Sequence, residues 1–415
     1  MTATAERIAV LLPSLHGGGA ERSMLTLIDG FRDRGRSVDL LLCKHKGALL
    51  SEVPADVSLY ELEEAGSLRA RLGVALRAPG HFSSLLRPVV LAGKVAPEIA
   101  RIPALTDYLN KAKPDALLSA ISYANLAAIW ANRRLRKHIP LVVSERIALA
   151  SYCSSPENSR KWRWRYLPEL IRNSYPEADA VVGVSQEVCR ELNEEIGLTH
   201  DTMRTIYNPV VGERLREMAA ATPPHEWLDG AGPPVILAAG RLTYQKDFAT
   251  LIEAFAKLRA TREARLVILG EGKLAPELEA LAAQLGVAGD VDLPGFASNP
   301  FAYMARAAVF VLSSRYEGLS GVLIQALGCG CPVVSTDCPG GAAEILDGGR
   351  YGRVIPVGDS EAMSGALLAE LNHPTPREPL LQRAETFSVD NAVDHYLALL
   401  DAAVAGVPIP GEQAD

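Results

Sequence analysis

Two cations in the second half of the chain have the spacing of a phosphate site. Arg241 and Lys246 directly follow the apolar run 235–239, in the segment G-R-L-T-Y-Q-K-D. Two cations at the end of a buried strand can converge on a diphosphate and neutralise the charge that develops on a departing nucleotide. The alternative is that both are solvated surface cations.

A second segment, 313–332, combines a loop carboxylate with glycines at the predicted start of a helix. Glu317 precedes Gly318 to Gly321, and Gln325 follows about two turns into the helix. A helix start offers backbone N–H groups to an anion, and glycine keeps the approach open. A structural helix capped by Ser320 would explain the same residues without a ligand.

The third motif is the glycine run in the segment S-L-H-G-G-G-A-E-R near the N-terminus. Gly17, Gly18 and Gly19 follow the apolar run 8–12 and precede a predicted helix. They permit close approach of a ligand to the backbone, and the helix start offers free N–H groups. A tight strand-to-helix turn without a ligand is the alternative.

Short β-branched runs that alternate with helical stretches must position these motifs. The predicted strands are 8–12, 38–42, 116–118, 141–144, 180–184, 235–239, 266–269, 309–312 and 333–335. Most are apolar throughout, as expected of parallel strands covered on both faces. Ligands of such sheets bind at the carboxyl ends of the strands, and all three motifs follow a strand.

Linker chemistry divides the chain into two domains. Pro209 blocks helix continuation, and the segment 222–234 is rich in proline and glycine. We therefore predict one domain over 1–208 and a second over 209–387. A last amphipathic helix begins after Ser388, and we expect the segment 388–415 to return toward the N-terminal domain.

Together the motifs resemble the family 4 retaining glycosyltransferases, which have the two-domain GT-B fold. The resemblance runs nearly end to end. It rests on G-G-G-A-E-R, I-Y-N-P-V, G-R-L-T-Y-Q-K-D-F, L-G-E-G, G-F and E-G-L-S-G-V-L-I-Q-A-L-G-C-G-C-P-V-V-S-T-D. It implies an α/β protein of two Rossmann-like domains with mostly parallel sheets that face a central cleft. V-S-E-R beside G-G-G-A-E-R resembles bacterial enzymes that extend lipid-linked or polysaccharide-precursor sugars.

The resemblance also implies roles. Arg241 and Lys246 would hold the donor diphosphate, and Glu317 would bind hydroxyls of the donor sugar. The remaining donor-binding positions are Gly17, Gly18, Gly19, Gly270, Glu271, Gly272, Gly295, Phe296, Gly318, Leu319, Ser320, Gln325 and Glu344. The family generally retains anomeric configuration and needs no metal ion or other cofactor.

Two departures from the family concern the sugar and the acceptor. The second of two acids that the family places eight residues apart is Gln325 here. Many relatives also present a histidine near the reacting sugar, and none stands at a strand end in the first domain. The acceptor-side candidates are His16, Tyr123, Asn125, Glu145 and Arg146. Glu145 and Arg146 can alternatively form a simple ion pair.

Composition separates the two halves of the chain. Residues 1–208 carry 27 Lys and Arg against 23 Asp and Glu, whereas the whole chain has a net charge of −7. This is too weak a basic excess for a nucleic-acid partner.

The six cysteines lack C-x-x-C spacing, and Asp290-Val291-Asp292 is read as a chance D-x-D, so no metal site is predicted. No secretory signal is apparent, and we expect a cytoplasmic protein.

Basic residues interleaved with apolar ones suggest contact with an anionic membrane. Residues 66–101 contain Arg69, Arg71, Arg77, Arg87, Lys94 and Arg101 and one acid, Glu98. Further cations lie in R-K-W-R-W-R at 160–165 and in 133–137. Basic segments with tryptophan suit an anionic interface. Ordinary surface helices with solvated arginines are the alternative.

The sequence thus predicts a retaining glycosyltransferase at the inner face of the membrane. Its partners would be a nucleotide-sugar donor, with uridine as the expected base, and a lipid or lipid-linked saccharide acceptor. Two enzyme alternatives share the fold, a nucleotide-sugar epimerase and a soluble glucan synthase. A catalytically silent scaffold that binds a membrane or a partner is the third.

Overall fold

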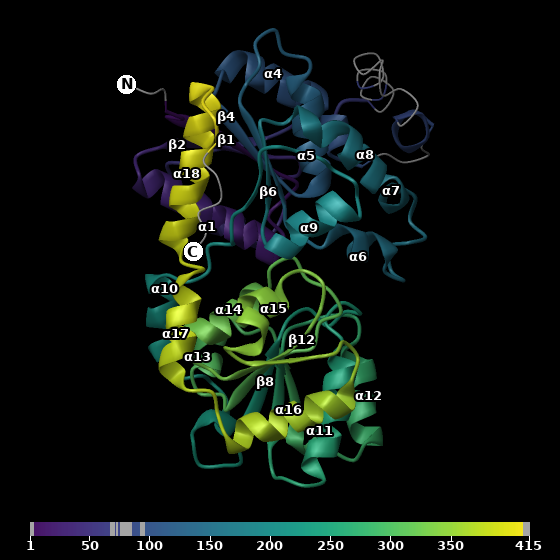
Figure 1. The fold of residues 1–415 in the computed structure, drawn as a ribbon, viewed down its shortest axis with the longest axis vertical. Helices are drawn as coiled ribbons and strands as arrows, with labels where there is room; N and C mark the ends of the chain where they lie inside the picture. The colour runs from purple at the N-terminus through teal and green to yellow at the C-terminus, as the bar shows by residue number, and fades with distance from the viewer. Residues whose placement is uncertain (1–3, 67–70, 72–73, 75–84, 92–95, 410–415) are drawn as a thin grey trace. The chain divides into compact units, whose positions relative to one another are not determined.

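The computed structural model describes residues 4–409, apart from 67–70, 72–73, 75–84 and 92–95. The chain forms two compact units (Figure 1). Unit 1 is Met1–Pro209 together with Val389–Asp415, and unit 2 is Val210–Ser388. The sequence placed the corresponding boundaries at residues 208 and 388.

Unit 1 is built on a parallel sheet of seven strands in the order β3-β2-β1-β4-β5-β6-β7. The strands are β1 (Arg7–Leu12), β2 (Ser37–Leu42), β3 (Ser58–Glu61), β4 (Ala116–Ala120), β5 (Leu141–Glu145), β6 (Ala180–Gly183) and β7 (Met203–Thr205). The order reverses between β1 and β4, and the carboxyl ends of the strands on either side of such a reversal form a ligand-binding crevice.

Helices cover both faces of this sheet. They are α1 (Gly19–Asp33), α4 (Ile102–Ala112), α5 (Ser122–Asn132), α6 (Leu149–Ser154), α7 (Trp162–Arg165), α8 (Leu167–Ser174), α9 (Gln186–Glu194) and α18 (Val389–Ala405). One face packs against α1 and α18, with Phe31 and Tyr396 in its core. Gly30 lets these two helices meet, because a Cβ there would lie 2.2 Å from Cγ2 of Val393.

Unit 2 repeats the design with a six-stranded parallel sheet in the order β10-β9-β8-β11-β12-β13. Its strands are β8 (Val235–Ala239), β9 (Arg265–Leu269), β10 (Val291–Gly295), β11 (Val309–Leu312), β12 (Val333–Thr336) and β13 (Arg353–Ile355). Here the order reverses between β8 and β11. The two strands that precede Arg241 and Glu317 are therefore neighbours at the point of reversal.

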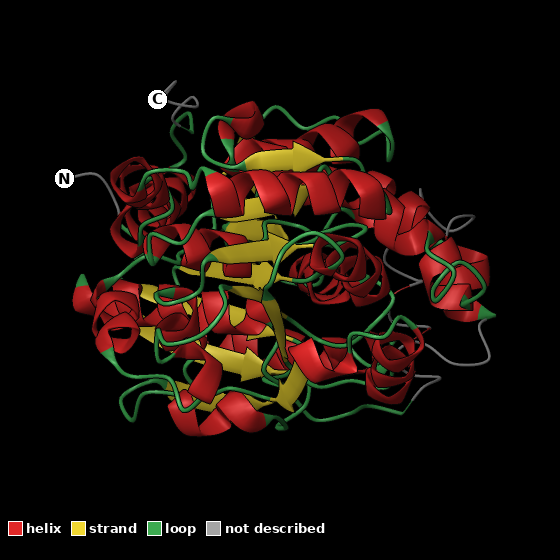
Figure 2. Ribbon diagram, turned by 90° about the horizontal axis from the view of Figure 1, so that it is seen from below, coloured by secondary structure: helices red, strands yellow, loops and turns green. Residues whose placement is uncertain are grey.

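Figure 2 shows the strands of the molecule with helices around them. In unit 2 the helices come before, between and after the strands of its sheet. They are α10 (Glu213–Ala220), α11 (Phe248–Arg259), α12 (Ala275–Gln284), α13 (Pro300–Met304), α14 (Gly321–Gly328), α15 (Ala342–Ile345), α16 (Ser360–Asn372) and α17 (Arg377–Glu385). Residues of α11, α12 and α16 share one core with the strands. The predicted α/β class with two parallel-sheet domains is confirmed.

The nine predicted strands all form, and those the sequence did not predict lie at sheet edges. β3, β7 and β13 are three or four residues long and only partly buried, so they lack the continuous apolar run of a central strand. β10, the fourth edge strand, is also only partly buried and contains Pro294. Within the described residues, no helix combines the length and apolar character needed to cross a membrane.

Candidate active site

The loops after β8 and β11 meet at the reversal of strand order in unit 2. Lys246 Nζ lies 2.6 Å from Oε1 of Glu317, and the two side chains are 13% and 10% exposed. Ser314 Oγ, fully buried, donates a 2.6 Å hydrogen bond to the same carboxylate oxygen. Gly240 leaves room for the lysine, because a Cβ there would lie 3.0 Å from its Cε.

Hydrogen bonds from neighbouring loops hold the backbone that carries the Glu317 side chain. Gln245 Nε2 donates to the carbonyl oxygen of Tyr316 at 2.9 Å, and the amide of Glu317 donates to Pro339 at 2.7 Å. Gly340 has a φ of 110°, and a Cβ there would lie 2.0 Å from the carbonyl oxygen of Glu317. Only glycine fits this approach, so the G-G pair after β12 supports the Glu317 loop.

The start of α14 adds polar groups close to Glu317 along the chain. Gly318, Leu319 and Ser320 are buried, and Ser320 is the N-cap residue of α14. In the first turn, Leu323 already donates its amide to the Ser320 carbonyl at 3.2 Å, whereas the amides of Gly321 and Val322 precede this first backbone hydrogen bond. Ser320 Oγ is buried and has no hydrogen-bond partner among the described residues. An unsatisfied hydroxyl at the N-terminal end of a helix is a suitable place for a phosphate oxygen.

Three glycine loops of unit 2 pack edge to edge. Gly270 has a φ of 135°, and a Cβ there would lie 2.0 Å from the carbonyl oxygen of Gly240. A Cβ on Gly272 would lie 2.3 Å from that of Leu242, whose amide donates to Glu271 at 2.9 Å. Gly270 donates to Gly295 at 2.8 Å. The G-E-G, G-R-L and P-G-F segments thus form one surface.

The remaining donor-side candidates differ in exposure. Arg241 is exposed, and the Phe296 side chain is 73% exposed at the end of β10. Gln325 is half-buried on α14. Glu344 is half-buried on α15, and its carbonyl oxygen accepts a 2.7 Å hydrogen bond from Arg383. All of the predicted donor-side residues except Gly17 to Gly19 fall within residues 210–388 and so belong to unit 2.

The glycine run of unit 1 does not offer all of its amides to a ligand. Glu21 Oε2 accepts hydrogen bonds from Gly18 at 2.7 Å and from Gly17 at 2.9 Å. Glu21 Oε1 accepts a further one from Ser14. The expectation of free N–H groups was wrong for these two positions, because a carboxylate of the same helix already occupies them. An acid at the third helical position is a frequent partner of the N-cap amide.

Glu145 is a buried acid on the α5 side of the sheet in unit 1. Its carboxylate accepts hydrogen bonds from Tyr175 Oη, from Ser122 Oγ at 3.0 Å and from Asn125 Nδ2 at 3.4 Å. Burial raises the pKa of Glu145 to about 7, although these hydrogen bonds oppose the shift. Glu145 and Asn125 are at most 1% exposed, so neither presents a surface to an acceptor.

Arg146 points to the other face, as alternation along a strand requires. Its Nη2 donates to Ser23 Oγ at 2.8 Å, and its Nη1 contacts Tyr396 Oη at 3.2 Å and Ser144 Oγ at 3.3 Å. Burial lowers the pKa of Arg146. The predicted Glu145–Arg146 ion pair does not form, and the expectation that Arg146 faces an acceptor was wrong.

Tyr123 and His16 are placed differently from each other. Tyr123 is buried, and its Oη donates a 2.6 Å hydrogen bond to the carbonyl oxygen of Arg163. Burial raises the pKa of Tyr123, so the phenol stays protonated at neutral pH. His16 is exposed in the loop after β1. Of the five acceptor-side candidates, only His16 is open to solvent.

Two lysines that were not predicted as site residues also follow the end of a strand. Lys44 and Lys46 follow β2, and the amide of Leu15 donates to the Lys46 carbonyl at 3.0 Å. A Cβ on Gly47, which has a φ of 135°, would lie 1.8 Å from the Leu15 carbonyl oxygen. Both lysines are exposed, and no carboxylate of the described chain pairs with them. The segment K-H-K, one residue after the end of β2, was the available signal. It also places His45 near a strand end, so the expectation that the first domain has no such histidine was wrong.

The predicted basic surface divides into unlike parts. Arg101 is buried and pairs with Glu64 at 2.9 Å, and Arg133 pairs with Glu177. Neither is a free surface cation, which corrects the prediction for these two residues. Arg69, Arg77 and Lys94 lie outside the described residues. Arg71 donates to the Val90 carbonyl at 3.3 Å, and Arg87 is exposed.

The segment Arg160–Arg165 keeps its cations exposed. Trp164 lies under it, with its ring centroid 5.0 Å from that of Tyr152 and 5.8 Å from that of Tyr123. The Trp162 side chain is 45% exposed. Arg136 and Lys137, also exposed, follow the far end of α5, about 16 Å from its start at 1.5 Å per residue. The basic segments are therefore separate patches.

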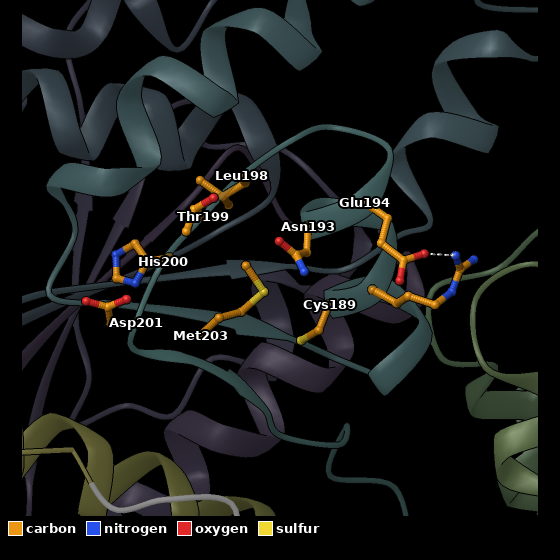
Figure 3. Close-up of a pocket in the computed structure, with 9 residues that line it drawn as sticks. Cys189, Asn193, Glu194, Leu198, Thr199, His200, Asp201 and Met203 are labelled. Carbon is orange, nitrogen blue, oxygen red and sulfur yellow. Dashed lines mark hydrogen bonds and ion pairs between the residues drawn. The ribbon is translucent and has the colours of Figure 1, made fainter.

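A shallow cavity of about 400 Å³ lies away from all of these residues (Figure 3). Its wall includes Cys189, Asn193, His200 and Met203, from α9 and the edge of the sheet at β7. Burial lowers the pKa of His200. No predicted site residue lines this cavity, so it gives no support to the donor or acceptor assignments.

The D-x-D segment is engaged in structural contacts. Asp290 pairs with Arg259 at 2.7 Å, and Asp292 lies 3.0 Å from Nε2 of His225. In the part of the chain that the structure describes, no group of three His, Cys, Asp or Glu side chains is arranged to hold a metal ion. These contacts agree with a chance match to the motif.

The fold has two parallel-sheet units, with a polar cluster at the reversal of strand order in unit 2, and comparison with known proteins gives the family. The model of glycosyltransferase family 4 matches residues 17–214, and that of glycosyl transferases group 1 matches 233–373. The chain therefore belongs to the family 4 glycosyltransferases.

Two relatives come from Campylobacter jejuni. One is N-acetylgalactosamine-N,N'-diacetylbacillosaminyl-diphospho-undecaprenol 4-alpha-N-acetylgalactosaminyltransferase, 33% identical over 221 residues, which are 52% of this chain and 57% of the relative. This match thus spans little more than half of the relative's length. The other is GalNAc-alpha-(1->4)-GalNAc-alpha-(1->3)-diNAcBac-PP-undecaprenol alpha-1,4-N-acetyl-D-galactosaminyltransferase, 26% identical over 95% of this chain and 98% of the relative.

Among solved structures, Anabaena HepE in complex with UDP has a TM-score of 0.70 and 19% identity, over 94% of this chain and 98% of that one. At this identity the likeness establishes the fold alone, and that fold is GT-B.

Proposed function

We propose that this chain is a retaining glycosyltransferase that transfers a sugar from a UDP-sugar to a lipid-linked saccharide. The observation that carries the proposal is the Lys246–Glu317–Ser314 cluster at the reversal of strand order in unit 2, beside the start of α14. It combines a cation, an oriented carboxylate and the N-terminal end of a helix. A sugar diphosphate needs each of these partners.

In this proposal Lys246 serves two partners. An ammonium group has three N–H donors, and one is directed at Glu317. The others remain for the donor diphosphate, together with exposed Arg241. Both cations would neutralise the negative charge that builds up as the nucleotide diphosphate leaves. We infer that this replaces a metal ion, as the family resemblance implies.

Glu317 would accept hydrogen bonds from hydroxyls of the donor sugar. Ser314 and Lys246 both contact Oε1. Among the described residues, Oε2 has only a long 3.5 Å contact from Gln245. Oε2 is therefore the oxygen with capacity for a sugar hydroxyl. An ionised carboxylate is acceptor-only, so it orients a hydroxyl donor in one sense.

For the nucleotide, the exposed Phe296 ring offers an apolar face to the base, and the Gly270–Gly272 loop would border the ribose. HepE was crystallised with UDP, which supports uridine as the base. Of the three glycines near the N-terminus, Gly17 and Gly18 have their amides engaged by Glu21.

The acceptor would be bound by unit 1. The names of both Campylobacter relatives specify acceptors on an undecaprenol diphosphate. A diphosphate-linked acceptor requires cations, and Lys44 and Lys46 stand at the end of β2 near the crevice of that sheet. Trp162 and the cations around it would hold the protein at an anionic membrane surface, at the cytoplasmic face.

A screen of nucleotide sugars by thermal unfolding tests the donor assignment. A ligand at a hundred times its Kd stabilises the folded state by about 2.7 kcal/mol, which is readily measured. We expect UDP and at least one UDP-sugar to raise Tm, and Lys246→Ala to lose the effect. Stabilisation by UDP that is equal in wild type and Lys246→Ala would contradict the proposed site.

A further inference from the structure

Asp247 has a backbone conformation that its side chain does not favour. Its φ is 49°, in the left-handed region, where a Cβ is disfavoured. It stands between Lys246 and the first residue of α11. Such outliers persist only when surrounding contacts hold them, and they cluster at functional sites. The contacts of Asp247 therefore show which groups stabilise its left-handed conformation.

Those contacts lead to Arg315. The Asp247 carboxylate accepts a 2.9 Å hydrogen bond from Thr250 Oγ1, and Nη2 of Arg315 lies 2.8 Å from its Oδ2. The carboxylate is 5% exposed and the arginine side chain 33% exposed. The guanidinium also lies over the Tyr244 ring, 4.7 Å from its centroid. One side chain thus joins the loop after β11 to two residues of the loop after β8.

The backbone makes the same junction on both sides of Lys246. The Arg315 amide donates to the Gln245 carbonyl at 2.8 Å, and Ser313 Oγ donates to the Lys246 carbonyl at 2.7 Å. Arg315 therefore holds residues 244, 245 and 247, and the Lys246 side chain between them is directed at Glu317. Arg315 itself has no contact with Glu317 in the described structure.

We propose that Arg315 is a positioning residue for donor binding, which fixes the orientation of the Lys246 side chain by pairing with Asp247 and lying on Tyr244. This rests on the proposed function, because the orientation of Lys246 matters only if its ammonium group binds a diphosphate. The planar guanidinium combines a carboxylate contact with ring stacking, and a lysine ammonium has no such plane. Without Arg315, the loop would sample other conformations, and an anionic donor would have to order it upon binding.

Arg315→Met is the central variant, because it keeps an unbranched side chain over Tyr244 and removes the charge. The matched control is Arg259→Met. Arg259 pairs with Asp290 at 2.7 Å, with side chains 24% and 31% exposed, at the opposite end of α11 from Asp247. Each variant breaks one partly exposed ion pair of unit 2, but only Arg315 borders Lys246.

Asp247→Gly separates positioning from stability. Glycine relieves the left-handed conformation, so the folded state should not be weakened at this point. It also removes the carboxylate that Arg315 holds. A role for Asp247 in folding alone predicts that this variant binds donor normally. A positioning role predicts that it behaves like Arg315→Met, and that the double variant is no worse than either single one.

The readouts are the Kd for UDP by calorimetry, Tm, and donor KM and kcat on a UDP-sugar. We expect Arg315→Met and Asp247→Gly to raise the Kd and the donor KM at least tenfold, with kcat within threefold. Arg259→Met should leave both constants unchanged. The inference is overturned if Arg315→Met binds UDP as wild type does, or if the two single effects multiply in the double variant. It is also overturned if Arg259→Met weakens UDP binding equally.

The UDP measurement does not depend on turnover. A wild-type protein that binds UDP but transfers no sugar would contradict the proposed function. The role of Arg315 would then still be supported or overturned by the Kd values alone.

Discussion

Glu317 and Gln325 differ in charge and in surroundings, which sets what each can contribute. Glu317 is tied to Lys246 and Ser314, whereas Gln325 is a half-buried amide on α14. An amide can accept from one ribose hydroxyl and donate to the other. It also avoids a second negative charge beside a diphosphate. We therefore expect Glu317, and not Gln325, to be the catalytic residue that contacts the donor sugar.

The first prediction contrasts these two positions. Glu317→Gln should lower kcat by at least ~10²-fold, the scale of losing a preorganised polar group. Gln325→Glu should change activity less than tenfold, mainly through donor KM, because neutral and charged hydrogen bonds differ by about 1 kcal/mol. Steady-state kinetics with a UDP-sugar gives both values. A hundredfold rise in kcat for Gln325→Glu would make natural Gln325 a disabling residue and favour the silent scaffold.

A second prediction at this scale uses Glu145 as a pH probe. Burial raises its folded-state pKa to about 7, and an unfolded glutamate titrates near ~4.3. Between these values the folded state holds a proton that the unfolded chain has released. The stability from this group is therefore full below about pH 4 and is lost as the pH rises through about 7.

Urea unfolding at pH 5 and pH 8 measures this effect. The fall in unfolding free energy from pH 5 to pH 8 should be smaller in Glu145→Gln than in wild type. The amide keeps an acceptor for Tyr175 or Ser122 but does not titrate. Identical falls in the two proteins would show that Glu145 does not have the raised pKa.

At the scale of elements, the strand ends decided most of what the sequence could predict. The central strands are continuous apolar runs, and the residues directly after β8 and β11 form the candidate site. Short edge strands such as β7 lack that signal. The partners of Glu145 and Arg146 could not be predicted, because Tyr175 and Tyr396 come from distant segments that meet only in the folded sheet.

The third prediction concerns α7 and the residues before it. Trp162 and the exposed cations Arg160, Lys161, Arg163 and Arg165 should bind anionic vesicles, with about 1 kcal/mol from each cation near the surface. The variant Lys161→Glu/Trp162→Ala/Arg163→Glu should lose flotation with phosphatidylglycerol vesicles. Tyr123 would keep its contact, which is to a main-chain carbonyl.

The control is Arg136→Glu/Lys137→Glu, which changes exposed cations beyond the far end of α5. It should float nearly as wild type does, and 0.5 M salt should weaken both by screening. Equal loss in the two variants would mean that overall charge, and not the α7 segment, governs binding.

At the scale of the molecule, the last helix belongs to the unit in which the chain begins. Val393 and Tyr396 of α18 lie in the core of unit 1, and Arg34 pairs with Asp390 and Asp394. The approach of α1 and α18 depends on Gly30. The chain thus enters unit 2 only after β7 and leaves it before α18, so folding of unit 1 needs both ends of the sequence.

The fourth prediction tests the packing of α18 against α1 with a glycine-to-alanine substitution made separately at two sites. Gly30→Ala places a methyl group 2.2 Å from Val393 Cγ2 and should lower Tm, since overpacking costs about 1–3 kcal/mol. Gly365→Ala on α16 meets no atom within 4 Å and should raise stability by about 0.5–1 kcal/mol. Calorimetry of both variants checks the signs. A stable Gly30→Ala protein would mean that α1 and α18 are not closely packed.

The central claim is that unit 2 holds a nucleotide-diphosphate sugar through Arg241 and Lys246 for transfer. The most direct measurement is release of UDP from a UDP-sugar, with membrane extract that supplies lipid-linked acceptors. Wild type should release UDP, and Arg241→Ala and Lys246→Ala should each lower kcat/KM by at least ~10²-fold. Lys257→Ala, which removes an exposed cation paired with Glu361, should match wild type. Activity of both site variants within threefold of wild type would contradict the account.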